Sequence, residues 1–351
     1  MRILQFLFFL SLPFNWLIGQ NSDNTIKLLV SKDSVSFYSF NKKGVSEYTV
    51  LESKKLSKKY IEYSKPFPEE LKLVELDVLA PVVSEDGSVY FLYPGGGVLF
   101  KYFNGLFERI DESFAHRNQF SGYFFEYKKE LYLLGGYGYW KANSLLIKFN
   151  FEVRNWELVS ALGQTPKNGI NNGSFVLDKN KLHVFDFYTR VDDLNVKNNS
   201  HYVLDLDQML WKKEGALNNT LFNESKKEYE LQAEFGNSLL QKNVDEWPLR
   251  IITPRDNQIR FYNAEQLHNV NSLAIVVGKN IVYPVLSADR EYETLIVRDL
   301  YHNITLINEE YLTNDFNLFT SYFIYAGGFC LLLILLTFVK FKKEKLVLLL
   351  S

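Results

Sequence analysis

The sequence predicts an all-β domain that is exported and held on a membrane by one helix near the C-terminus. The middle of the chain consists of short runs in which apolar and polar residues alternate, and 16% of all residues are aromatic. Alternation with a period of two is typical of strands with one buried face, and aromatic side chains fill the layers between packed sheets. Two long apolar stretches lie on either side of this middle, one near each end.

The N-terminal stretch has the pattern of a secretory signal peptide. Met1-Arg2 provides a basic start, Ile3–Ile18 is apolar, and the small residue Gly19 precedes a polar run. Pro13 lies inside this stretch, which makes it a poor spanning helix because a span needs about 20 predominantly apolar residues. We therefore predict a signal peptide over 1–19 and an exported domain over 20–320.

The exported domain contains many strand-length runs and little sign of helix. Each run is rich in aromatic and β-branched residues and is bounded by turn residues. The segment Ser53–Leu73, where a lysine-rich run meets two prolines, is the one region expected to be helical or irregular. The clearest strand runs are Ser88–Tyr93, Glu130–Leu134, Lys181–Phe187 and Gln258–Tyr262.

Three stretches of the domain align as repeats. In each, a strand pair is followed by a glycine run or its substitute, then a third strand, then a large aromatic residue. Four short strands fit into about 50 residues, which is one blade of a β-propeller, so the domain predicts about six four-stranded blades, with five to seven possible. The alternative is a pair of β-sandwiches with coincidental spacing. The residues that mark the repeats are Gly95, Gly96, Gly135, Gly136, Phe107, Trp156 and Trp211.

These marker residues resemble the repeat of the kelch family of β-propellers, in which a glycine pair ends the second strand and a Trp follows the third. Gly135-Gly136 with Trp156 matches best, whereas the preceding repeat has Phe107 in place of Trp and the following one has Asp186 in place of glycine. The resemblance is clear only to about residue 215. It implies glycines that allow close backbone packing and aromatic residues that pack between neighbouring blades.

No catalytic, metal or cofactor site is predicted. The five histidines have no metal-ligand spacing, and the single cysteine, Cys330, lies in the C-terminal apolar stretch. The resemblance also suggests copper oxidases of the galactose-oxidase type, which are propellers with a Tyr–Cys cross-link. The predicted exported domain contains no cysteine, so it cannot form this cross-link. A formal net charge of −2 argues against nucleic-acid binding. We expect a protein that is not an enzyme.

One loop stands out as a candidate binding surface. Gly136–Trp140 holds three aromatic residues, and Tyr and Trp are prominent in interface hot spots. The alternative is that Tyr139 and Trp140 pack on the next blade. The equivalent loop one repeat later, Arg190–Asp193, is expected to join the same surface. The candidate binding residues are Tyr137, Tyr139, Trp140, Arg190, Asp192 and Asp193.

The C-terminal apolar stretch predicts a transmembrane helix over 321–341. Tyr322–Val339 contains no charged residue, and lysines follow it. A helix of about 20 residues crosses the hydrocarbon core, and its cationic flank faces the cytoplasm. The tail 342–351 is therefore expected to be cytoplasmic and the large domain to lie outside, in the periplasm if the source is a Gram-negative bacterium.

These features together predict a single-pass membrane protein whose propeller binds or senses an unknown protein or glycan. It resembles kelch-type ectodomains of Bacteroidetes-style envelope proteins, where a propeller and one helix precede a cytoplasmic regulatory domain. The tail 342–351 is too short to fold as a domain, so the output is expected from a partner or from a domain absent here. Two alternatives are a structural subunit of an envelope complex, which would expose an apolar patch, and a glycan-processing enzyme. The enzyme would use Asp192, Asp193 and His201 if these converge in one pocket.

Overall fold

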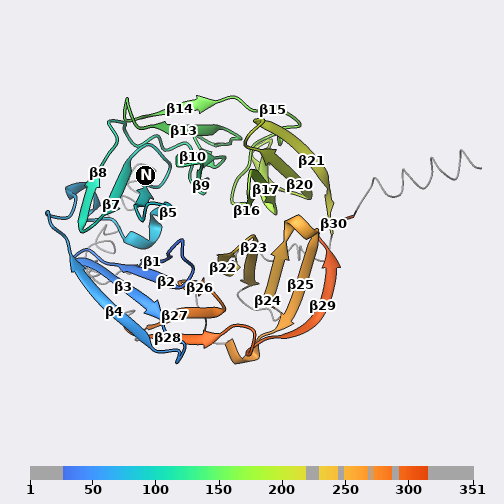
Figure 1. Ribbon diagram of the computed structural model, residues 1–351. Helices are drawn as coiled ribbons and strands as arrows, with labels where there is room; N and C mark the ends of the chain where they lie inside the picture. Colours follow the sequence, from blue (N-terminus) through green and yellow to red (C-terminus); the bar gives the residue numbers. More distant parts are fainter. Residues whose placement is uncertain are drawn as a thin grey trace, which may run out of the picture.

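The computed structural model is a six-bladed β-propeller, which confirms the predicted all-β fold class and blade number (Figure 1). It describes residues 27–218, 229–243, 249–267, 270, 272–286 and 292–314. The predicted signal peptide (1–19), transmembrane helix (321–341) and cytoplasmic tail (342–351) lie outside these residues. Within the described ranges, no helix has the length and apolar character needed to cross a membrane.

In blades 1 to 4, four antiparallel strands follow one another from the central axis to the rim, and blade 4 also holds the short strand β15 (Leu162–Gly163), which runs parallel to its outermost strand (Figure 1). Blade 1 contains β1 (Lys27–Val30), β2 (Ser36–Phe40), β3 (Gly44–Val50) and β4 (Leu56–Glu62). Blade 2 contains β5 (Ala80–Val83), β6 (Val89–Leu92), β7 (Leu99–Phe103) and β8 (Leu106–Arg109). Blade 3 contains β9 (Tyr123–Tyr127), β10 (Glu130–Leu134), β13 (Leu146–Asn150) and β14 (Asn155–Val159), and blade 4 contains β16 (Ser174–Asp178), β17 (Lys181–Phe185), β20 (Ser200–Asp205) and β21 (Leu210–Leu217).

The segment expected to be helical or irregular, Ser53–Leu73, is partly a strand. Its first half forms β4 on the rim of blade 1, and the short 3₁₀ helices η3 (Glu69–Leu71) and η4 (Leu76–Val78) follow. The alternating pattern is weak in β4 because this outermost strand is largely exposed on both faces and needs few apolar residues.

The last two blades depart from the expected four strands. Blade 5 has β22 (Tyr229–Phe235), β23 (Ser238–Asn243), β24 (Leu249–Thr253) and β25 (Gln258–Asn263), with η6 (Pro254–Asp256) between the last two. Blade 6, which follows η7 (Glu265–Leu267), has only β26 (Ile275–Val277), β27 (Asn280–Leu286) and β28 (Tyr292–Asp299) in the described part of the chain. The next strand, β29 (Thr305–Tyr311), turns back to become a fifth strand of blade 5, and β30 (Thr313–Asn314) pairs with β21 of blade 4.

This returning segment is fixed by Asn257, which has a left-handed φ of 53° at the end of η6. Its Oδ1 accepts hydrogen bonds from the backbone N–H and the Oγ1 of Thr313, both 2.8 Å, and its Nδ2 donates to the Thr313 carbonyl at 3.1 Å. The Asn257 carbonyl accepts a further bond from the Leu312 N–H. The Asn257 side chain and carbonyl thus hold the chain at Leu312 and Thr313, where β29 in blade 5 ends and β30 begins to pair with blade 4.

A separate apolar cluster fills each boundary between neighbouring blades. Blades 3 and 4, for example, share Tyr132, Phe175 and Trp211. Blades 6 and 1 share no strand in the described part of the chain, and side-chain packing joins them, through Leu28, Phe37 and Val282 among others. Radial sheets buried on both faces explain why the strands are rich in aromatic residues.

The repeat markers occupy equivalent places in blades 2 to 4. The glycines, or Asp186, follow the second strand, and Phe107, Trp156 and Trp211 lie in the fourth strands β8, β14 and β21. Gly136 has a φ of +104°, and a Cβ there would lie 2.6 Å from the Gln119 backbone, so this close approach requires glycine. Trp156 donates from Nε1 to the Gly97 carbonyl at 2.7 Å, which links the rim of blade 3 to the glycine turn of blade 2.

Candidate functional site

Blades 3 and 4 each carry a short hairpin between their second and third strands. These hairpins are β11 (Tyr137–Gly138) with β12 (Lys141–Ala142), and β18 (Phe187–Val191) with β19 (Leu194–Asn198). Successive strands of a blade run in opposite directions, so second connections lie on one face of the propeller and first and third connections on the other. Both hairpins therefore project from the same face, which we call the hairpin face.

Tyr139 and Trp140 form the tip of the first hairpin. Their φ angles are 48° and 65°, the left-handed pair of a type I′ turn, for which Asn-Gly is the preferred sequence. Both side chains are exposed, at 70% and 78%. Tyr139 Oη donates to the His116 carbonyl at 3.1 Å. The two rings therefore do not pack into the next blade, which was the alternative expectation for this loop.

The two predicted loops lie together. Arg190 of β18 donates from Nη1 to the Tyr137 hydroxyl, and Asp193 forms an ion pair with Arg190 Nη2 at 3.3 Å. Asp192 and Asp193 occupy an exposed turn with φ angles of 46° and 65°. The structure thus brings together Tyr137, Arg190 and Asp193, whereas Asp192 makes no hydrogen bond or ion pair within the described part of the chain.

Sequence reasoning missed Phe114 and His116, which extend the hairpin face. Phe114 is 74% exposed, and its ring centroid lies 5.4 Å from that of His116, edge to face. His116 hydrogen-bonds the Ser113 hydroxyl at 2.9 Å, and burial lowers its pKa. The signal was a lone Phe in the polar segment that links blades 2 and 3, but nothing in the sequence showed that Tyr139 would hydrogen-bond the His116 backbone in this segment.

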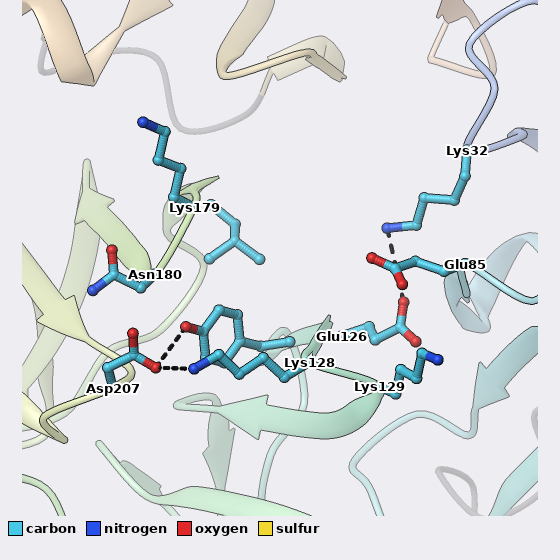
Figure 2. Close-up of a pocket in the computed structure, with 10 residues that line it drawn as sticks. Lys32, Glu85, Glu126, Lys128, Lys129, Lys179, Asn180 and Asp207 are labelled. Atoms are coloured by element: carbon cyan, nitrogen blue, oxygen red, sulfur yellow. Dashed lines mark hydrogen bonds and ion pairs between the residues drawn. The ribbon is translucent and has the colours of Figure 1, made fainter.

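A cavity of about 560 Å³ lies on the opposite face, among the first-connection turns of blades 1 to 4 (Figure 2). Figure 2 shows Lys32, Glu85 and Glu126 on one side of it and Asn180 and Asp207 on the other. The turns converge here because they follow the innermost strands around the central axis. We call this the turn-face cavity, and its lining residues are Lys32, Glu85, Glu126, Tyr127, Lys128, Lys129, Leu177, Lys179, Asn180 and Asp207.

The charges in the turn-face cavity are only partly paired. Lys128 forms an ion pair with Asp207, whose Oδ1 also accepts a hydrogen bond from Tyr127 at 2.8 Å. These two donors, Lys128 first, lower the pKa of the Asp207 carboxyl. Lys32 Nζ lies 3.8 Å from Glu126 Oε2. The Glu126 side chain is only 5% exposed, and it accepts a hydrogen bond from the Ser84 hydroxyl.

The candidate residues for glycan chemistry do not converge. His201 is buried in blade 4, where its Nε2 lies 2.9 Å from Nδ1 of His183, whereas Asp192 and Asp193 form the exposed tip of a hairpin. Burial lowers the pKa of His183 to about 4 and that of His201 to about 3. Over the described ranges, no group of three or more metal-ligating side chains is found.

No protein-family model matches this chain, and none of the curated proteins shows significant similarity to it.

Proposed function

We propose that this protein is a binding module that recognises another protein through the hairpin face. The observation that carries the proposal is the exposure of Tyr139 and Trp140 at the tip of a tight turn. A propeller suits such a role because it presents loops from a rigid scaffold. Tyr and Trp are also the residues that contribute most to protein–protein interfaces.

The turn chemistry strengthens this proposal. A left-handed conformation costs a non-glycine residue about 1–2 kcal/mol, and the tip places two large aromatic residues in it side by side. Asn-Gly would form the same turn at lower cost. Residues held in sparsely populated backbone conformations cluster at functional sites, where the surrounding structure holds them in place.

The base of the hairpin is held before any partner arrives. Arg190 bridges to the Tyr137 hydroxyl at 2.8 Å, and the Phe120 and Tyr137 backbones exchange two hydrogen bonds. A surface fixed in advance loses little conformational entropy on binding, so more of the contact energy remains as affinity.

We include in this proposal the cellular location and the type of repeat that the sequence predicts. We propose that residues 1–19 direct export, that 321–341 anchor the chain in the membrane, and that the blades are of the kelch type. The propeller then acts as the sensing or binding part of an envelope protein. A glycan-processing enzyme has less support because His201 is buried and lies apart from Asp192 and Asp193.

The test is site-specific photocrosslinking of the full-length protein in its own membranes. A photoreactive phenylalanine replaces Trp140 in one variant and Leu158, which is similarly exposed on the blade 3 rim, in a control. We expect a discrete adduct from position 140 that position 158 does not give and that the Tyr139→Ser background weakens. Identical adduct patterns from the two positions, or no adduct from position 140, would contradict the proposal.

A further inference from the structure

We propose that the turn-face cavity binds a saccharide that carries one carboxylate. This site is separate from the hairpin face, because first and third connections lie on the opposite side of the propeller from the two hairpins. Its volume of about 560 Å³ is within the range of small-molecule sites.

The lining excludes several ligand classes. Leu177 and the ring of Tyr127 are its main apolar surfaces, so an apolar ligand would gain little from entering. Four lysines repel a cation, and three carboxylates repel a multiply charged anion. A polyhydroxylated ligand suits this mixture because each hydroxyl donates to a carboxylate and accepts from an ammonium group.

The cavity has acceptors fixed in place for such hydroxyls. The nearly buried carboxylate of Glu126 is held between the Ser84 hydroxyl and Lys32. Asn180 uses its Nδ2 to donate to both oxygens of Asp205, each at 3.2 Å, which leaves its carbonyl oxygen as an acceptor. Fixed acceptors favour a ligand with donors at matching positions, because little ordering remains to be done on binding.

The charge balance indicates one acidic group on the ligand. Lys32 and Lys128 have carboxylates beside them, whereas Lys129 and Lys179 have no ion-pair partner in the described part of the chain. Counting all lining side chains, four ammonium groups face three carboxylates, an excess of one positive charge. A single ligand carboxylate near Lys129 or Lys179 would neutralise that excess.

The test uses the detergent-solubilised full-length protein and ligand-observed saturation-transfer NMR. The probes are D-glucuronate, D-galacturonate and D-mannuronate, with the matching neutral hexoses and inorganic phosphate as comparisons. We expect at least one uronate to bind about tenfold more tightly than its neutral hexose, as expected for one charge-assisted contact, and phosphate to give no saturable shift in the ³¹P spectrum.

Two variants locate the site. Replacing the two lining lysines that have no ion-pair partner among the described residues (Lys129→Met with Lys179→Met) should reduce uronate binding to the level of the neutral hexose. Lys141→Met, on the hairpin face, should leave uronate binding unchanged. The inference is overturned if no uronate binds, if phosphate binds as well as the uronate, or if the double variant keeps full affinity. Photocrosslinking at Trp140 is unaffected by any of these results, so the two proposals fail separately.

Discussion

Arg190 of β18 donates a 2.8 Å hydrogen bond from Nη1 to the hydroxyl of Tyr137 in β11, and its guanidinium carbon lies 5.3 Å from the centroid of the same ring. This contact joins the hairpins of blades 3 and 4 through two residues that lie 53 positions apart in the sequence. The two loops therefore form one surface, and the contact supports the hairpin that carries Tyr139 and Trp140 at its tip.

Arg190→Ala should therefore weaken partner crosslinking at Trp140 more than it weakens the fold. The side chain is 19% exposed, and the variant loses one hydrogen bond and one ion pair, so we expect a fall in unfolding free energy of about 1 kcal/mol and a several-fold loss of the adduct. Adduct yield and urea unfolding measure the two effects. Arg190→Lys is the matched variant, because lysine keeps the charge but lacks the planar fork. Full adduct yield from Arg190→Ala would show that the bridge does not position the hairpin.

Asn257→Ala should destabilise the whole propeller, because its side chain holds the returning strand at Thr313 through three hydrogen bonds. We expect a loss of about 2–4 kcal/mol in unfolding free energy, at roughly 1 kcal/mol per bond, with a further cost for alanine at a left-handed φ. Urea denaturation followed by tryptophan fluorescence measures it. Asn195→Ala, at an exposed position of β19, should change stability by less than about 0.5 kcal/mol. Equal effects of the two variants would contradict the role of Asn257.

Gly136→Ala should cost much more stability than Gly87→Ala. Both residues have positive φ, +104° and +81°, but a Cβ at Gly136 would lie 2.6 Å from the Gln119 backbone while that at Gly87 meets nothing within 4 Å. Gly87→Ala thus reports the conformational cost alone, about 1–2 kcal/mol. The excess measured for Gly136→Ala by urea unfolding is the cost of moving the segment between blades 2 and 3. Equal losses of unfolding free energy in the two variants would mean that the segment containing Gln119 moves aside without cost.

Stability should fall as the pH drops from about 6.5 towards 4, because the folded state keeps His183 and His201 neutral. Burial lowers the two pKa values to about 4 and about 3, so between these values and the ordinary histidine pKa the unfolded chain binds more protons. The groups that face His183 are Asp178 and Glu214, which raise its pKa, and Lys181, which lowers it; His201 faces His183. Urea midpoints measured from pH 7 to pH 4 test this.

Replacing the pair (His183→Gln with His201→Gln) should flatten the pH dependence in that window, even if it lowers stability overall. The control Asn195→Ala leaves both histidines in place at an exposed position of β19 and should keep the slope of the unsubstituted protein. A slope that persists in the double variant would assign the acid sensitivity to other groups.

The sequence predicted the blade architecture because the relevant signals are local. Alternation over Glu130–Leu134 and the glycines at 135–136 report a strand and the turn after it, and both depend on neighbouring residues. The spacing of Phe107, Trp156 and Trp211 along the sequence predicted a repeat of about 50 residues. Dividing the length of the domain by this repeat predicted about six blades. The irregular structure expected at Ser53–Leu73 was partly wrong, because a rim strand such as β4 buries too little surface to impose alternation.

The sequence predicted which two loops form the candidate surface, but not the exposure of their side chains or the other residues that join them. The aromatic loop at Tyr139 and Trp140 was visible as composition, and the loop at Arg190–Asp193 was expected beside it from the repeat. Whether the rings would be buried or exposed depended on the φ angles of the turn and on the packing of the neighbouring blade. Phe114 and His116 joined the surface through a contact between blades that no local pattern encodes.

By itself the sequence determined the strands, the turns and their repetition, because each is set by hydrophobic periodicity and backbone preference over a few residues. Only the tertiary structure decided that β29 returns to blade 5 and that blade 6 has three strands in the described part of the chain. The alternation of residues within a strand does not specify which sheet edge the strand will pair with. The tertiary structure alone also assembled the turn-face cavity, from turns of four blades that meet around the central axis. Ring closure brings such distant residues together, and it is a property of the packed sheets as a whole.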